Sequence, residues 1–106
     1  MKAKTSELIG PALDWAVAKC AGLKGVVEDG PVIREYYPST DWSQGGPIIE
    51  REKINLKFYD EEWIADPHDI DSICQRKHGP TPLIAAMRCY TARHLGEEVQ
   101  VPDELA

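Results

Sequence analysis

The segment from Thr81 to Gly96 constrains the fold most, because it carries helix signals at both ends. Thr81 is a favoured N-cap residue, Pro82 suits a first helical turn, and Gly96 directly follows the helix expected over 83–95. One face of this helix carries Leu83, Ala86, Met87, Tyr90 and His94, and the back face carries the small residues Ala85, Cys89 and Ala92. Small side chains let a neighbouring element approach closely, so we expect the central core helix here. We interpret His94 as a core histidine rather than a catalytic base.

A second helix is expected over residues 12–21, between Pro11 and Gly22. Its apolar stripe consists of Leu13, Ala16, Val17 and Cys20. Trp15 falls nearly opposite that stripe and therefore needs a partner of its own. That partner is either a covering loop or sheet, or a ligand pocket or oligomer contact.

Strand patterns indicate a sheet. Residues 54–59 alternate apolar and polar side chains, and the runs 23–28 and 32–37 flank the turn Asp29-Gly30-Pro31 as a hairpin would. Shorter expected elements are helical segments over 46–53 and 67–77, a loop over 60–66, and an edge strand or extended cover around 99–101. Together these elements predict a single small α+β domain over residues 1–106, with helices packed on a mostly antiparallel sheet.

The net charge of -6 is concentrated in one run without Lys or Arg, which contains Asp60, Glu61, Glu62, Asp66, Asp69 and Asp71. Such a run argues against direct binding to nucleic acid or to an anionic membrane. It is either a solvated acidic face, or a patch that docks on a basic protein or imitates nucleic acid.

Three widely spaced cysteines, Cys20, Cys74 and Cys89, form no Cys-x-x-Cys pair and favour a reducing compartment. No signal sequence and no long apolar run is visible, so we expect a cytoplasmic protein. Cys74 and His78 could share a helical face, but two ligands do not make a zinc site. We expect neither a metal nor a cofactor.

The stretch 36–53 is the candidate binding site, because it combines aromatic, hydroxyl, amide and basic side chains around Gly45-Gly46. A helix starting at Pro47 would aim free amides at an anion, and Trp42 and Tyr37 could stack on a planar base. Arg51 or Lys53 would supply positive charge. The expected ligand-binding residues are Trp15, Tyr37, Thr40, Asp41, Trp42, Ser43, Gln44, Gly45, Gly46, Arg51 and Lys53.

A loop locked by its own contacts is the alternative for this stretch. In that case Asp41 caps a turn, Trp42 is a buried anchor, and Arg51 pairs with Glu50 or Glu35.

Three segments resemble the NinX-type family of phage proteins: Asp14 to Cys20, Pro38 to Lys53, and Gly79 to Tyr90. The tail from Leu95 to Leu105 fits the same family, whereas 26–37 and 57–75 depart from its pattern and are where we expect partner specificity to be set. The resemblance implies a small accessory protein of lambdoid phages in an infected bacterial cytoplasm, and it implies no enzymatic activity.

We therefore expect a non-enzymatic binder of a small nucleotide-like or anionic ligand, which could sequester a host defence signal. The alternative is an inhibitor or adaptor that uses its acidic face against a host or phage protein. A homo-oligomer is compatible with either function, and an enzyme acting on nucleotides is the least favoured hypothesis.

Overall fold

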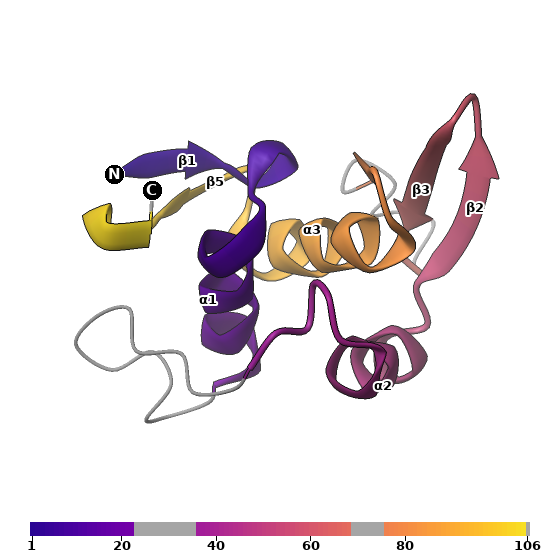
Figure 1. Cartoon of the computed structure of the whole chain (residues 1–106), viewed down its shortest axis with the longest axis horizontal. Coiled ribbons are helices and arrows are strands. Elements are labelled where there is room, and N and C mark those ends of the chain that lie inside the picture. The colour runs from indigo at the N-terminus through magenta and orange to yellow at the C-terminus, as the bar shows by residue number, and fades with distance from the viewer. Residues whose placement is uncertain (23–35, 69–75, 106) are drawn as a thin grey trace.

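The computed structural model of the chain describes residues 1–22, 36–68 and 76–105 (Figure 1). The elements are strand β1 (Lys2–Lys4), 3-10 helix η1 (Thr5–Glu7), helices α1 (Gly10–Ala21) and α2 (Trp42–Glu52), strands β2 (Asn55–Tyr59), β3 (Glu62–Asp66) and β4 (Lys77–Gly79), helix α3 (Pro82–Leu95), strand β5 (Glu98–Gln100) and 3-10 helix η3 (Asp103–Leu105). Every strand pairing among these elements is antiparallel, which confirms the predicted α+β class.

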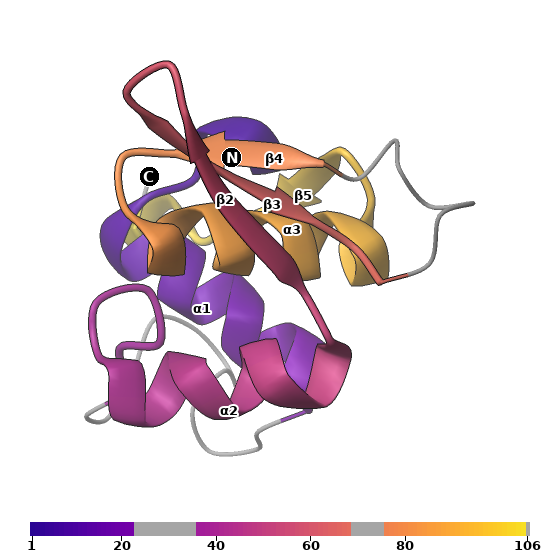
Figure 2. The same ribbon diagram turned by 90° about the vertical axis from the view of Figure 1, so that its right-hand side faces the viewer.

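Helix α3 forms the middle layer of the molecule. Figure 2 shows the sheet of β2, β3 and β4 on one side of α3 and the helices α1 and α2 on the other. Side chains are accordingly buried all around α3, including Ile84 and Thr91 outside the predicted apolar face. The predicted central helix is confirmed, and Met87 at its centre is fully buried.

The ends of α3 follow from its sequence signals. The Thr81 hydroxyl accepts a hydrogen bond of 3.1 Å from the Ile84 amide, and Pro82 occupies the first turn, where its missing N–H costs nothing. Gly96 ends the helix with a φ of 89°, which a side chain would disfavour.

One face of the three-stranded sheet packs on α3. Cross-strand partners share a face, so Leu56 with Ala65 and Phe58 with Trp63 lie on the same side of the sheet. On β4, Gly79 pairs with Trp63, and a Cβ at Gly79 would lie 2.7 Å from the Ala85 amide nitrogen. The glycine therefore lets β4 lie directly on the backbone of α3.

The predicted edge strand near residue 99 is also confirmed. It is β5, which pairs with β1 in a second sheet, with Ala3 opposite Val99. The expectation of one sheet is therefore corrected to two, because the two ends of the chain pair with each other away from the three-stranded sheet.

Three predicted boundaries were wrong. Helix α2 begins at Trp42 instead of 46, residues 62–66 form a strand instead of a loop, and Lys77 lies in β4 instead of a helix. The predicted hairpin over 23–37, apart from its last two residues, and the stretch 69–75 lie outside the described residues.

Helix α1 is buried more widely than one stripe. Ala12 to Ala18 are all buried, including Trp15, and Gly22 ends the helix in the left-handed conformation. None of the helices in the described segments is long and apolar enough to cross a membrane.

A buried polar contact ties α1 to the turn that precedes α2. Oδ1 of Asp14 accepts a hydrogen bond of 2.9 Å from the backbone amide of Ser39. Burial raises the pKa of Asp14 above its ordinary value, and the hydrogen bond from the Ser39 amide offsets part of that rise.

Close packing of α2 on the same turn requires a glycine. A Cβ at Gly45 would lie 2.3 Å from the Pro38 carbonyl oxygen and 2.6 Å from Cδ2 of Leu83. At the next residue, Gly46, the nearest such atom is 3.9 Å away, on the Trp42 ring. Two adjacent glycines in one helix thus have different roles.

We predict opposite effects of alanine at these two positions. Gly45→Ala should destabilise the fold by about 1 to 3 kcal/mol, because the methyl group has no room. Gly46→Ala should stabilise it by up to about 1 kcal/mol through helix propensity and reduced freedom of the unfolded chain. Urea titration of both variants measures the difference, and equal stabilities would contradict the close contact at Gly45.

A second prediction concerns pH. A raised pKa means that Asp14 binds its proton more tightly in the folded state, so its contribution to stability is present at low pH and is lost as pH rises through the folded pKa. The unfolding free energy of the wild type, relative to Asp14→Asn, should therefore fall from acid to neutral pH. Urea titrations at a series of pH values test this, and a difference independent of pH would refute it.

Candidate functional site

The candidate stretch 36–53 is mostly helix, which changes the chemistry expected of it. Asp41 is the N-cap of α2: its Oδ1 accepts hydrogen bonds from the Ser43 amide at 2.9 Å and the Ser43 hydroxyl at 2.7 Å. The amides expected to face an anion beyond Pro47 instead lie inside α2. The amide-rich end of the helix is occupied by the Asp41 carboxylate, which disfavours a second anion there.

The residues before α2 form a compact turn. The Tyr37 carbonyl accepts hydrogen bonds from the amides of Thr40 at 3.0 Å and Asp41 at 2.8 Å. The side-chain oxygen of Gln44 accepts a hydrogen bond from the Tyr37 amide and closes the turn against α2. Many of the polar side chains in 36–53, including that of Asp41, thus form hydrogen bonds that stabilise the local structure. This agrees with the alternative of a loop locked by its own contacts.

Trp42 departs from that alternative, because it is 54% exposed and not a buried anchor. It borders a small notch of about 210 Å³ where the N-terminal ends of α2 and α3 meet. Thr40 and Thr81 also line this notch, and Tyr37 nearby in the chain is exposed. Ligand pockets usually measure about 300 to 1,000 Å³, so the notch offers room for a single ring.

Arg51 lies at the other end of α2, about 13 Å from Trp42 along the helix axis at 1.5 Å per residue. Its guanidinium group bonds Glu52 at 3.1 Å and the Tyr90 hydroxyl at 3.3 Å. Of the two partners expected for Arg51, Glu50 forms no ion pair with it in the described part of the chain, and Glu35 lies outside the described residues. Lys53, the C-cap of α2, is exposed at the same end. Trp42 and Arg51, which were expected to bind one ligand together by stacking and by charge, therefore lie at opposite ends of α2.

His94 belongs to the cluster around Arg51. Its ring stacks edge-on against Tyr90 at 4.7 Å, and its Nε2 lies 3.6 Å from Glu52. Because the side chain is 41% exposed, the interpretation of His94 as a core histidine was wrong. It lies in the last turn of α3, beyond the part of that helix that is covered.

Trp15 is part of the core and does not line the notch at Trp42. The Lys19 ammonium group lies 5.1 Å from the centre of its ring. Among the described residues its indole Nε1 is buried without a hydrogen-bond partner.

The most exposed aromatic side chains lie at the end of the β2–β3 hairpin, on the last two residues of a correctly predicted strand. Phe58 is 59% and Tyr59 is 70% exposed. The two turn residues, Asp60 and Glu61, have left-handed φ angles of 53° and 64°. We call Phe58, Tyr59, Asp60, Glu61 and Glu62 the hairpin tip. The Trp63-Ile64-Ala65 run after the turn was the available strand signal, but the turn lacks the Asn or Gly that normally marks a hairpin.

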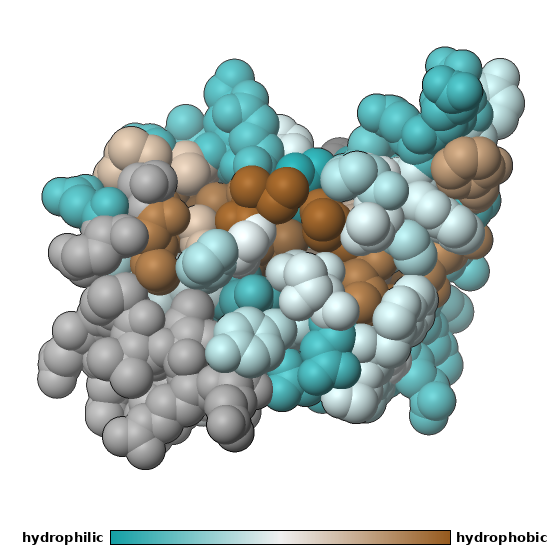
Figure 3. Space-filling model, in the orientation of Figure 1, coloured by the Kyte–Doolittle hydropathy of each residue, from teal (hydrophilic) through white to brown (hydrophobic). Residues whose placement is uncertain are grey.

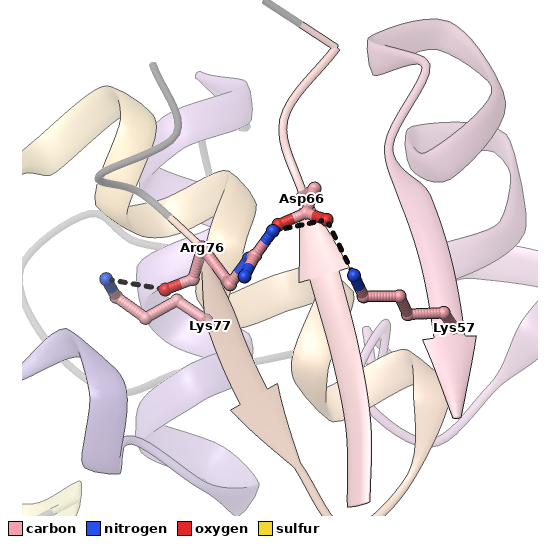
Figure 4. Close-up of polar contacts among 4 residues, drawn as sticks. All are labelled: Lys57, Asp66, Arg76 and Lys77. Atoms are coloured by element: carbon pink, nitrogen blue, oxygen red, sulfur yellow. Dashed lines mark hydrogen bonds and ion pairs between the residues drawn. The ribbon is translucent and has the colours of Figure 1, made fainter. Parts of the chain in front are cut away.

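The acidic run divides into two parts in the structure. Figure 4 shows Asp66 held between Lys57 on β2, at 4.0 Å, and Arg76 just before β4. The side chain of Lys77, the residue after Arg76, donates a hydrogen bond of 3.2 Å to the Arg76 carbonyl. Asp66 is thus neutralised within the sheet, Glu62 contacts His78 at 2.7 Å, and Asp60 and Glu61 stay exposed. Asp69 and Asp71 lie outside the described residues.

A polar groove of about 540 Å³ beside β4 is lined largely by charges that are already bonded. Lys77 pairs with Glu97 at 3.1 Å, and Arg88 donates hydrogen bonds of 2.8 Å to the carbonyls of Leu8 and His78. These contacts tie η1, β4 and α3 together.

The two cysteine thiols in the described residues have low reactivity. Burial raises the pKa of Cys20 and of Cys89 to about 11 each, so both stay protonated at neutral pH and are poor nucleophiles or metal ligands. Within residues 1–22, 36–68 and 76–105, no group of three or more His, Cys, Asp or Glu side chains is placed to hold a metal ion.

Comparisons with known proteins bear on identity. A comparison with curated protein sequences finds no significant match. The family described as "Bacteriophage P22, NinX" matches residues 4–94, which include α1, α2, the β2–β3 hairpin, β4 and nearly all of α3. The chain therefore belongs to the NinX family of bacteriophage proteins and is a small phage accessory protein.

Proposed function

We propose that this phage protein acts without catalysis, as an inhibitor or adaptor that binds a basic surface of a host or phage protein with its hairpin tip. The observation that carries the proposal is the combination of Phe58 and Tyr59, both more than half exposed, with an acidic turn at the end of one hairpin. Figure 1 shows that this hairpin projects from the body of the molecule, which makes its tip accessible to a large partner.

The backbone of the turn supports a role beyond folding. A left-handed conformation costs a residue with a side chain roughly 1 to 2 kcal/mol, which is why two-residue hairpin turns favour Asn-Gly. Asp60 and Glu61 both adopt it. Asp tolerates this conformation much as Asn does, but Glu61 stands where such a turn normally has Gly. Its presence there indicates that the Glu61 side chain is needed for something other than making the turn.

The side chains at the tip define the partner. Aromatic residues are typical anchors of protein interfaces, and acids steer association toward positive potential. A matching surface would carry Lys or Arg around an apolar recess. Asp66 is excluded from this contact, because Lys57 and Arg76 already neutralise it.

We predict that stability and binding respond in opposite directions at the turn. The double variant Asp60→Asn, Glu61→Gly should raise the melting temperature, since Asn and Gly tolerate left-handed φ angles, while partner capture falls and loses its salt dependence. Affinity capture from phage-infected cells, followed by quantitative mass spectrometry and titration of the purified partner, measures this.

Tyr59→Ala should weaken the same complex by about 1 to 3 kcal/mol, roughly tenfold to a hundredfold, and leave folding unchanged. The matched control is Tyr37→Ala, which removes another exposed tyrosine, in the turn before α2. Partner binding that survives both tip variants would refute the proposal.

Binding of a small nucleotide-like ligand, which would sequester a host defence signal, is the second candidate function. It is favoured by one observation, the exposure of Trp42 beside the notch between the helix ends. Stacking of a base on an aromatic ring contributes about 1 to 3 kcal/mol. Asp41 disfavours an anionic group close to α2, so the ring rather than the phosphate would occupy the notch.

For this second candidate, Trp42→Ala should weaken binding of a nucleotide about tenfold or more, whereas Arg51→Ala should not, because Arg51 lies at the far end of α2. Calorimetry with a panel of nucleotides, cyclic nucleotides and nucleotide sugars measures both. A wild type that gives no heat with any panel member would exclude this candidate.

A further inference from the structure

An apolar groove lies at the end of the molecule away from the hairpin tip. It measures about 490 Å³ and runs between β1, η1, the start of α1 and the C-terminal segment. Figure 3 shows hydrophobic side chains gathered on this face, over the start of α1 and beside the paired ends of the chain. The apolar residues that line the groove include Leu8, Ile9, Ala12, Val101 and Leu105.

Ile9 on the edge of the groove is unfavourably placed for an isolated chain. It is 54% exposed, although it is a large apolar side chain. It also lines the groove, so the apolar side chain and the apolar recess adjoin one another. A polar residue would suit solvent better at this position, so this isoleucine indicates a contact.

We infer that the groove is a two-fold symmetric interface with a second copy of this chain, in which Ile9 of each copy inserts into the groove of the other. A projecting apolar side chain directly beside an apolar recess is self-complementary under a two-fold axis. A second copy can therefore fill the groove, and no partner of a different shape is needed. The interface is independent of the proposed function of the hairpin tip.

The charges around the groove suit a second copy of this chain. Its charged side chains are Lys2 and Lys4 on β1, Glu7 on η1 and Glu98 on β5. None of these four forms an ion pair within the described part of the chain, and together they carry no net charge. A two-fold axis can therefore set lysines of one copy against glutamates of the other. The hairpin tip, by contrast, is acidic and would repel its own copy.

Sedimentation velocity of the full chain over a wide concentration range tests the interface. The wild type should form a dimer that dissociates on dilution. Ile9→Ser should weaken dimerisation roughly 100-fold, tenfold for each of the two isoleucines withdrawn from the interface. The matched control is Tyr59→Ser, which changes another exposed large side chain at the opposite end and should leave the dimer intact.

Folding of the variant is checked by thermal unfolding at low concentration. There Ile9→Ser should unfold at nearly the same temperature as the wild type, because the isoleucine side chain is more than half exposed. A wild type that stays monomeric at its highest soluble concentration overturns the inference and leaves the groove to another occupant. A dimer that survives Ile9→Ser overturns it too.

Hydrogen exchange on the wild type decides the question if the variant does not fold. On dilution, amides of residues 2–12 and 98–105 should lose protection, while those of the β2–β3 hairpin should not change. Concentration-dependent protection confined to any other surface would show that the dimer forms elsewhere.

Discussion

The fold depends on one constraint, which is that α3 must be covered on both sides by closely packed backbone. A helix that is buried all around can contact a sheet on one side and helices on the other only if small residues lie at the contacts. Gly79 meets the backbone of Ala85 on the sheet side, and Gly45 meets Leu83 and the Pro38 carbonyl on the helix side. A side chain at either glycine would force the layers apart, so two residues outside α3 determine how it is enclosed.

Sequence reasoning succeeded where the local signal and the tertiary structure agree. The caps at Thr81, Gly96 and Gly22 and the alternation before Tyr59 placed α3, the end of α1 and strand β2 correctly. It failed where tertiary contacts override propensity. Two glycines inside a helix cost about 1 kcal/mol each relative to Ala, so 42–46 read as a loop, although close packing requires Gly45. Strand β3 was missed because its hairpin turn contains two acids in place of Asn-Gly.

The candidate site illustrates what changes when a loop proves to be a helix. A loop can curl so that Trp42 and Arg51 face one ligand, but α2 separates the two residues along its axis. The Asp41 carboxylate caps α2 and is therefore already hydrogen-bonded. The same residues then divide between two places, the notch at the start of α2 and the cluster with Tyr90 and His94 at its end. The residue types alone suggest ring stacking at Trp42 and charge pairing at Arg51. The distance between these two residues, however, depends on where the helix begins.

The positions that folding alone would not choose are the most informative about function. Glu61 opposes a local preference with its left-handed φ angle, and Ile9 exposes a large apolar side chain beside the groove. The paired ends of the chain, which border the groove, lie on the other side of the molecule from the β2–β3 hairpin (Figure 1), so a contact at one does not obstruct the other. A dimer formed through the groove would present two hairpin tips at once. Linked tips rebind a partner with two sites at high effective concentration, which would let a small accessory protein hold such a partner tightly with two weak contacts.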